Sequence, residues 1–219
     1  MIHNNKSYKS LRTDLLQFVD NPKSILDVGC NEGVLGLYIK ENISKEIHVS
    51  GVDYNPSTIE VAKKRLDIAE ILDLNNQRET ESFLKKCPSF DHIILGDVLE
   101  HLINPIQTLN QLSKKLTENG KFIISLPNSN HYSSILHFFS LKWPRNDRGI
   151  FDKTHVHLYM LRNLKELAPD GFIIKKIKRK YRLKESSSSI LDKIIAIPLD
   201  YIPYFREFFT FQYVIVISK

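Results

Sequence analysis

Hydrophobic and polar positions alternate regularly between about residues 24 and 127. Five short, mostly apolar runs have the length of buried β-strands, namely 24–29, 47–53, 69–74, 90–97 and 120–127. Between them, apolar residues recur at the three- and four-residue intervals of a helix, in segments 34–42, 56–66, 78–86 and 105–116. Strands that alternate with helices indicate βαβ units, so we predict an α/β fold with a parallel sheet and helices on both faces.

The pattern changes on both sides of this region. Ahead of it, residues 7–19 have the spacing of one amphipathic helix. Behind it, residues 128–156 follow neither period. A predicted helix at 158–168, a strand after Gly171 and a long apolar strand at 209–219 complete the chain.

The chain has no internal repeat, so we expect one domain over residues 1–219. Residues from about 128 to 157 form a predicted insertion on the substrate side. An apolar segment at about 186–208 is expected to act as a lid or an interface.

Composition narrows the class of protein. Hydrophobic residues make up 42% and charged residues 26% of the chain, which is ordinary for a soluble globular protein. Cys30 and Cys87 are too few for a disulfide framework and suit a reducing compartment. The N-terminus lacks the apolar core of a signal peptide, and no apolar run reaches the roughly 18 residues of a membrane span. We therefore expect a cytoplasmic protein.

A glycine turn follows the first predicted strand, in the run Asp27-Val-Gly-Cys-Asn-Glu-Gly33. Glycine permits a positive φ and a close approach of a ligand, and a helix N-terminus offers free N–H groups. The second predicted strand ends in Asp53, where doubly wound nucleotide-binding folds place an acid on the ribose hydroxyls. A tight turn without any ligand is the alternative. A dinucleotide fingerprint fits poorly, since it needs glycine at positions 31 and 34 as well.

Four segments follow one another along the chain: ILDVGCNEGVLGLYI, GVDYNP, FDHIILGDVLEHLINP and LTENGKFIISLPNSNH. In this order and spacing they resemble the class I S-adenosylmethionine-dependent methyltransferases, and above all the branch with ubiquinone-biosynthesis-type O-methyltransferases. The later stretch GIFDKTHVHLYMLRNLKELAPDGFIIKK resembles a segment of related enzymes that act on small molecules. The resemblance implies a Rossmann-like, seven-stranded, mostly parallel sheet of order 3-2-1-4-5-7-6 with the last strand antiparallel. It also implies S-adenosyl-L-methionine as cofactor and S-adenosyl-L-homocysteine (SAH) as product.

The same resemblance assigns cofactor contacts at the carboxyl ends of the strands. Asp27 and Gly29 match the loop beside the methionine half of the cofactor. Asp53 matches the acid that binds the ribose, and Tyr54 matches the position that packs on the adenine. Asn31 departs from the family's central glycine, but asparagine is the residue other than glycine that best tolerates a left-handed backbone conformation. The expected contacts are Asp27, Gly29, Cys30, Asn31, Gly33, Asp53, Tyr54, Asp73, Leu74, Asp97 and Val98.

Methyl transfer from a sulfonium is an in-line displacement, and a hydroxyl acceptor usually loses its proton as it attacks. Histidine is the natural base near neutral pH. We rank His155 first, then His131, then His101, with a packed or surface histidine as the alternative for each. The pair His155-x-His157, with Asp152 as a third ligand, also suggests a metal site. The spacing of these residues does not resemble that of a known metal site, so we predict no metal.

The net charge of +6 comes from one segment, because residues 175–184 contain seven Lys and Arg and no acid. We interpret this run as the solvated face of an edge strand, with an anionic substrate or a membrane surface second. Nucleic acid is not an expected partner. Contact with a membrane surface and a homodimer stay open.

The sequence thus predicts an O-methyltransferase whose acceptor is a small molecule of sugar, lipid or similar type. The alternatives are an NAD(P)-dependent oxidoreductase on the same kind of sheet and a non-catalytic module that only binds S-adenosylmethionine.

Overall fold

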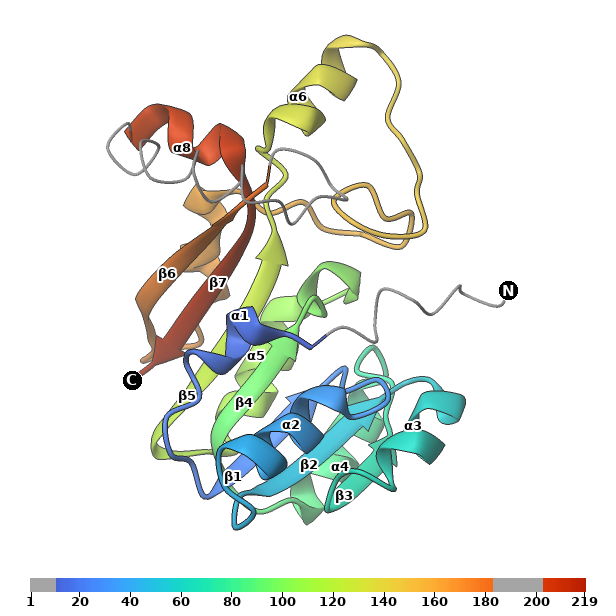
Figure 1. Ribbon diagram of the computed structural model, residues 1–219, viewed down its shortest axis with the longest axis vertical. Coiled ribbons are helices and arrows are strands. Elements are labelled where there is room, and N and C mark those ends of the chain that lie inside the picture. Colours follow the sequence, from blue (N-terminus) through green and yellow to red (C-terminus); the bar gives the residue numbers. More distant parts are fainter. Residues whose placement is uncertain (1–10, 183–202) are drawn as a thin grey trace.

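The computed structural model describes residues 11–182 and 203–219 and contains a sheet of seven strands in the order β3-β2-β1-β4-β5-β7-β6 (Figure 1). Strands β1 to β5 pair in parallel, and β7 runs antiparallel to β5 and to β6. The fold implied by the sequence resemblance is therefore confirmed, including its strand order. The strands are β1 Ser24–Val28, β2 His48–Asp53, β3 Ile68–Ile71, β4 Phe90–Gly96, β5 Leu116–Pro127, β6 Ile173–Tyr181 and β7 Thr210–Ser218.

Helices pack on both faces of the sheet because the central strands are apolar on both sides. In β4, Ile93 belongs to the hydrophobic cluster with α4, α5 and η2, whereas Ile94 belongs to the cluster with α1, α2 and α3. The helices are α1 Thr13–Leu16, α2 Val34–Asn42, α3 Pro56–Ala62, α4 Gln77–Lys86, α5 Pro105–Ser113, α6 Tyr132–Phe139 and α8 Pro203–Phe209. Two 3₁₀ helices, η1 Leu99–His101 and η2 Leu161–Leu167, complete the described elements.

Several predicted helices end earlier than their hydrophobic period indicated. Of the helix expected at 7–19, the described residues form only α1 and two further turns. The helix expected at 105–116 ends at Ser113, because Leu116 already pairs with Phe90 as the start of β5. The helix expected at 56–66 likewise ends at Ala62, although hydrogen-bonded turns continue to Leu66.

The helix predicted at 158–168 is the 3₁₀ segment η2. Ala168 adopts an extended conformation, as a residue before proline usually does, and Pro169 follows it. The irregular stretch after residue 127 holds the short helix α6. The apolar segment expected at 186–208 lies mostly outside the described residues, and only its end in α8 is seen.

The insertion and α8 lie beyond the carboxyl ends of β4 and β5 (Figure 1). Asn128, fully buried at the end of β5, fixes this arrangement. Its side-chain nitrogen donates to the carbonyl oxygens of Glu207 and Thr210, at 2.8 and 2.7 Å. Asn128, the last residue of the Leu126-Pro127-Asn128 motif, therefore joins the end of β5 to the start of β7 at the carboxyl ends of the strands.

Candidate functional site

The turn between β1 and α2 depends on Gly29 for two reasons. Its φ is +72°, and a Cβ atom there would stand 2.6 Å from Cγ2 of Val98. Its amide donates to the carbonyl of Val52 in β2 at 2.8 Å. The turn is therefore held against the ends of both neighbouring strands, β2 and β4.

Asn31 replaces a glycine without loss of the turn. Its φ is +51°, and its side-chain oxygen accepts the amide hydrogen of Glu32 at 2.8 Å. Its own amide donates to Oδ2 of Asp53 at 3.0 Å. The left-handed conformation expected for Asn31 is thus present, with the side chain capping the turn locally.

Asp53 links the glycine turn to the start of α3. Its other carboxylate oxygen accepts the amide hydrogen of Asn55 at 2.9 Å. The side chain is 9% exposed, and burial raises the pKa of this carboxyl although the two amides act against the rise. An acid so placed at the end of β2 can offer its oxygens to two vicinal hydroxyls, as a ribose has.

Asp27 is the second buried acid of the site. It is 5% exposed, and burial together with the charge of Asp53 raises the pKa of its carboxyl to about 7. The cause is desolvation first and Asp53 second, while Arg12 acts in the opposite direction. A cationic ligand group beside Asp27 would restore its ionised form.

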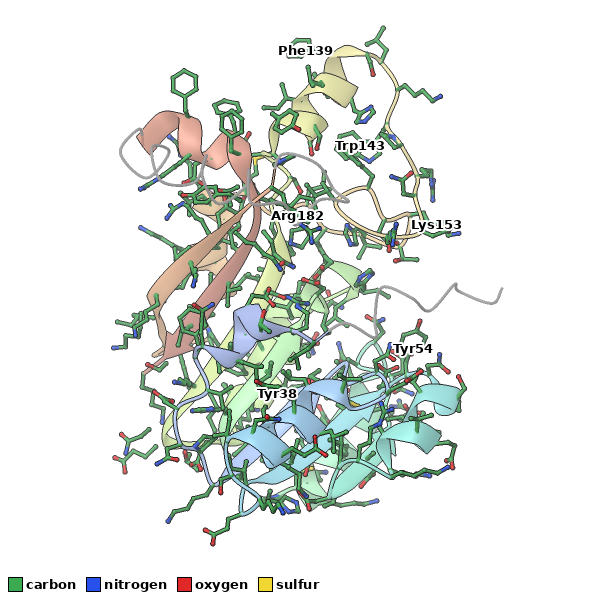
Figure 2. All side chains as sticks on the ribbon, viewed as in Figure 1. Tyr38, Tyr54, Phe139, Trp143, Lys153 and Arg182 are labelled. Carbon is green, nitrogen blue, oxygen red and sulfur yellow. The ribbon has the colours of Figure 1, made fainter. Side chains whose placement is uncertain are left out.

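The other predicted cofactor residues are spread along the carboxyl edge. Cys30 is buried, and burial raises the pKa of its thiol, so this thiol is packed rather than reactive. Tyr54 is 70% exposed and lies near α3 in Figure 2. Asp73 and Leu74 follow β3, which ends at Ile71, and Asp73 accepts the amide hydrogen of Asn75 at 2.9 Å.

Asp97 directly follows β4, has a positive φ of 57° and stands at the centre of a polar cluster. Its carboxylate accepts hydrogen bonds from Arg12 at 2.7 Å, Ser125 at 2.8 Å and Gln212 at 2.5 Å. Arg12 also donates to Asp14, whose pKa falls to about 2 because the guanidinium outweighs the effect of burial. The sequence indicated Asp97 but neither Arg12 nor Gln212, since both lie far from it along the chain.

A cavity of about 560 Å³ opens between these groups. One wall is the glycine turn with the start of α2, and the opposite wall comes from the insertion, the end of β6 and the start of β7. The lining residues are Arg12, Leu15, Asp27, Gly29, Cys30, Asn31, Val34, Leu35, Gly96, Asp97, Arg148, Gly149, Lys180, Arg182, Phe211 and Gln212. The predicted methionine-side residues therefore meet the insertion across one cavity, whereas Asp53, Tyr54 and Asp73 lie outside its lining.

The three candidate bases occupy different surroundings. His131 is 1% exposed, and its ring nitrogens contact the hydroxyl of Ser133 at 2.8 Å and the carbonyl of Arg182 at 2.9 Å. Its ring caps α6 and binds the end of β6, and burial lowers the pKa of its imidazole. Both nitrogens thus have structural partners.

His155 packs edge-on against His101, with ring centroids 4.8 Å apart. Its Nδ1 contacts the carbonyl of Ile150 at 3.2 Å, and its Nε2 stands 3.9 Å from Oε1 of Glu100. Glu100 is 1% exposed, and burial raises the pKa of its carboxyl well above the usual range.

His101 is oriented by a chain of two hydrogen bonds. The hydroxyl of Thr154 donates to Oδ1 of Asp152 at 2.6 Å and contacts Nδ1 of His101 at 2.9 Å. Because the hydroxyl has a single hydrogen, Nδ1 of His101 carries the proton in this contact and Nε2 holds the lone pair. Asp152 thus orients His101 through Thr154, much as the acid of a catalytic triad orients its imidazole.

The predicted pair of His155 and His157 does not come together. His157 contacts the carbonyl of Ile103 at 3.2 Å, and Asp152 is engaged by Thr154. Ligand atoms of Glu100, His101 and His155 do lie within 4.8 Å of one another. His101 has a hydrogen-bond partner in Thr154, whereas Oε2 of Glu100 is buried without a hydrogen-bond partner among the described residues. The prediction of no metal stays a prediction.

Comparisons with known proteins show the family of the chain. Residues 1–170 match the family model described as methyltransferase domain. The chain belongs to this methyltransferase family. The resemblance found in the sequence is therefore confirmed at the level of the family, which disfavours the oxidoreductase alternative.

Individual relatives are more distant. The chain is 33% identical over 110 residues to a ubiquinone biosynthesis O-methyltransferase of Coxiella burnetii, covering 49% of this chain and 45% of that protein. It is 31% identical over 109 residues to a malonyl-[acyl-carrier protein] O-methyltransferase of Anoxybacillus flavithermus, covering 50% and 40%. The matches thus span less than half the length of these relatives.

Among solved structures, the plantazolicin methyltransferase BamL, in complex with a triazolic desmethylPZN analog and SAH, superposes with a TM-score of 0.62 at 17% identity. That match covers 99% of this chain and 86% of the other. At such an identity the likeness concerns the fold. Within residues 11–182 and 203–219, no helix has the length and apolar character needed to cross a bilayer.

Proposed function

We propose that this chain transfers the methyl group of S-adenosylmethionine to an oxygen atom of a small-molecule acceptor. The observation that carries the proposal is the cavity shared by the glycine turn and the insertion, with Asp27 and Asp97 on its wall. The family match and the O-methyltransferase names of the two relatives support it.

The reaction needs little covalent chemistry from the protein. The acceptor oxygen attacks the methyl carbon as the bond from that carbon to sulfur breaks, and SAH leaves as a neutral thioether. Alignment and exclusion of water supply most of the acceleration. The acceptor hydroxyl gives up its proton as its oxygen gains the methyl group.

We assign the base to His101, with His155 second. Nε2 of His101 is the lone-pair nitrogen that remains after the Thr154 contact, whereas both nitrogens of His131 have structural partners. His101 is not among the residues that line the cavity, but it ends η1, which begins two residues after Asp97. His131 then acts as a packing residue of the insertion.

Methyl transfer is tested with S-adenosylmethionine carrying a tritiated methyl group and an extract of small metabolites and lipids. The full chain should transfer the tritiated methyl group to a product in the organic or the aqueous fraction. The substitution His101→Gln should lower the rate of this transfer about a hundredfold. His137→Gln is the matched control, because His137 lies on α6 and contacts Phe151. Bound SAH with no transfer to any fraction would favour the non-catalytic binding module.

The proposed acceptor includes lipid-type molecules because apolar side chains are exposed in and after α6 and in α8. Phe138, Phe139 and Leu141 are 72%, 77% and 96% exposed in and after α6, and Phe205 of α8 is 60% exposed. Both helices lie at the same end of the molecule (Figure 1), and Phe139 points outward there (Figure 2). Vesicles with anionic lipid should retain the protein at low salt, and Phe138→Ser with Phe139→Ser should release it. The cytoplasmic location and the homodimer stay predictions.

A further inference from the structure

Two imidazoles and one carboxylate meet where η1 contacts the insertion. Glu100 and His101 belong to η1, and His155 comes from the loop of the insertion that also carries Lys153, which Figure 2 labels. The amide of Val156 donates to the carbonyl of Glu100 at 2.9 Å and so holds this loop against η1. As a result, one potential ligand atom from each of the three side chains lies within 4.8 Å of the other two.

The carboxylate of Glu100 is buried and incompletely paired. The residue is 1% exposed, and its Oε1 stands 3.9 Å from Nε2 of His155. Its Oε2 has no hydrogen-bond partner in the part of the chain that the structure describes. A buried polar atom without a partner costs free energy, and a cation bound between the carboxylate and the imidazoles would offset that cost.

Both imidazoles present Nε2 as the free nitrogen. Nδ1 of His155 contacts the carbonyl of Ile150 at 3.2 Å, and a carbonyl only accepts, so Nδ1 carries the proton and Nε2 the lone pair. Nδ1 of His101 is held in the same state by Thr154 and, through it, by Asp152. Histidines that bind metals are commonly oriented in this way, with the second ring nitrogen donating to a carbonyl or to an acid.

The kind of atoms in this cluster indicates the kind of metal. Two imidazole nitrogens with one carboxylate oxygen are typical ligands of zinc, whereas magnesium and calcium prefer oxygen alone. Ligands about 2 Å from a zinc ion lie roughly 3 to 4 Å from one another, so small rotations of the three side chains bring their atoms into range. His101 is partly exposed, which leaves a fourth coordination position accessible to solvent.

We propose that Glu100, His101 and His155 bind a zinc ion, and that the bound ion inhibits methyl transfer. The inhibition rests on the proposed function, which assigns the base to Nε2 of His101. A lone pair that is shared with a metal cannot accept the proton of the acceptor hydroxyl, so the ion and the reaction compete for one atom. The sequence-based prediction of no metal considered His155 with His157 and Asp152, and the present set shares only His155 with it.

Zinc binding is measured by calorimetric titration of zinc chloride into the chelator-treated full chain, without cofactor or acceptor. We expect a single ion to bind with micromolar affinity. Glu100→Gln and His155→Gln should each weaken binding about a hundredfold, and Thr154→Val, which removes an outer hydrogen bond of the site, about tenfold. His137→Gln, in α6, is the control and should bind zinc as the wild type does. Magnesium chloride should not bind at the same concentrations.

Cobalt(II) gives a second readout of the site, because its visible absorption intensifies when fewer ligands surround it than in water. The absorption should appear with the wild type and be lost in Glu100→Gln and His155→Gln. Absence of zinc binding to the wild type overturns the site. Equal zinc binding by these two variants also overturns it, since the ion would then sit at other side chains. Equal affinity for magnesium overturns the choice of zinc.

The inhibition is measured by transfer of the tritiated methyl group with and without saturating zinc. Zinc should lower the rate about a hundredfold, as loss of the base does, and a chelator should restore it. Zinc that binds without slowing the transfer, or that accelerates it, overturns the inhibition. If no transfer occurs even without zinc, the proposed function fails, whereas the titration still decides whether the zinc site exists.

Discussion

Arg12 and Asp97, 85 positions apart in the sequence, form an ion pair at 2.7 Å on the wall of the cavity. The pair joins the segment before the sheet to the carboxyl end of β4. Ser125 lies within hydrogen-bonding distance of both partners. The arginine therefore sets the position of an acid on the wall of the cavity.

Arg12→Gln should lower the free energy of unfolding by about 2 kcal/mol and weaken SAH binding, because Asp97 and Asp14 lose their shared cation. Urea unfolding and calorimetry measure the two effects. In a double-mutant cycle, Asp97→Asn should cost less in the Arg12→Gln background than in the wild type. Additive effects would show that the pair is not coupled. Arg78→Gln, at an exposed position of α4, is the control.

Binding of SAH should depend on pH through Asp27. Because the pKa of this carboxyl is raised to about 7, lowering the pH from 8 to 6 converts most of it to the neutral form. An α-ammonium group of the cofactor beside it would then lose its counter-charge, so the affinity should fall about tenfold. Titrations across this range measure the slope, which Asp27→Asn should abolish. An unchanged affinity in the wild type would place the ammonium group elsewhere.

Stability toward acid should depend on His92. This imidazole lies near the start of β4, away from the carboxyl ends of the strands, and it is beside Asp20 and Lys121. Burial together with Lys121 lowers its pKa to about 4. A group whose folded-state pKa is depressed loses its contribution as the pH falls from about 6.5 through 4, a loss of roughly 3 kcal/mol at most. Urea unfolding between pH 7 and 4 should show this slope. His92→Gln should flatten it, and His48→Gln, at a half-exposed site, should not.

Asn31 should tolerate glycine better than alanine. At a φ of +51° alanine costs about 1 kcal/mol, whereas glycine loses only the side-chain bond to Glu32. Asn31→Gly should therefore keep the SAH affinity within about threefold, and Asn31→Ala should lower both stability and affinity. Equal behaviour of the two variants would mean that the left-handed turn is not required.

The sequence predicted the sheet well because its strands are apolar on both faces and its turns carry glycine or asparagine. Gly29, Asn31 and Asp53 lie where their residue types indicated, since each acts within a local turn. The remainder of the site is made by contacts between distant segments. Arg12, Gln212 and Arg148 have no motif around them, and only the folded chain brings them to Asp97 and to the cavity.

The helical bounds failed for a related reason. Leu116 continues the apolar period of α5, yet its pairing with Phe90 places it in β5. The ranking of the histidines depended on their place along the chain, and it stays a prediction. Their hydrogen bonds, such as those of Thr154 to His101 and of Ser133 to His131, could not be read from the sequence.

Calorimetric titration of SAH into the full chain tests the central claim most directly. The account predicts micromolar affinity, lost in Asp53→Ala and retained in Asp170→Ala, which alters an exposed turn before β6. No binding of SAH to the wild type, or equal binding by Asp53→Ala, would contradict it.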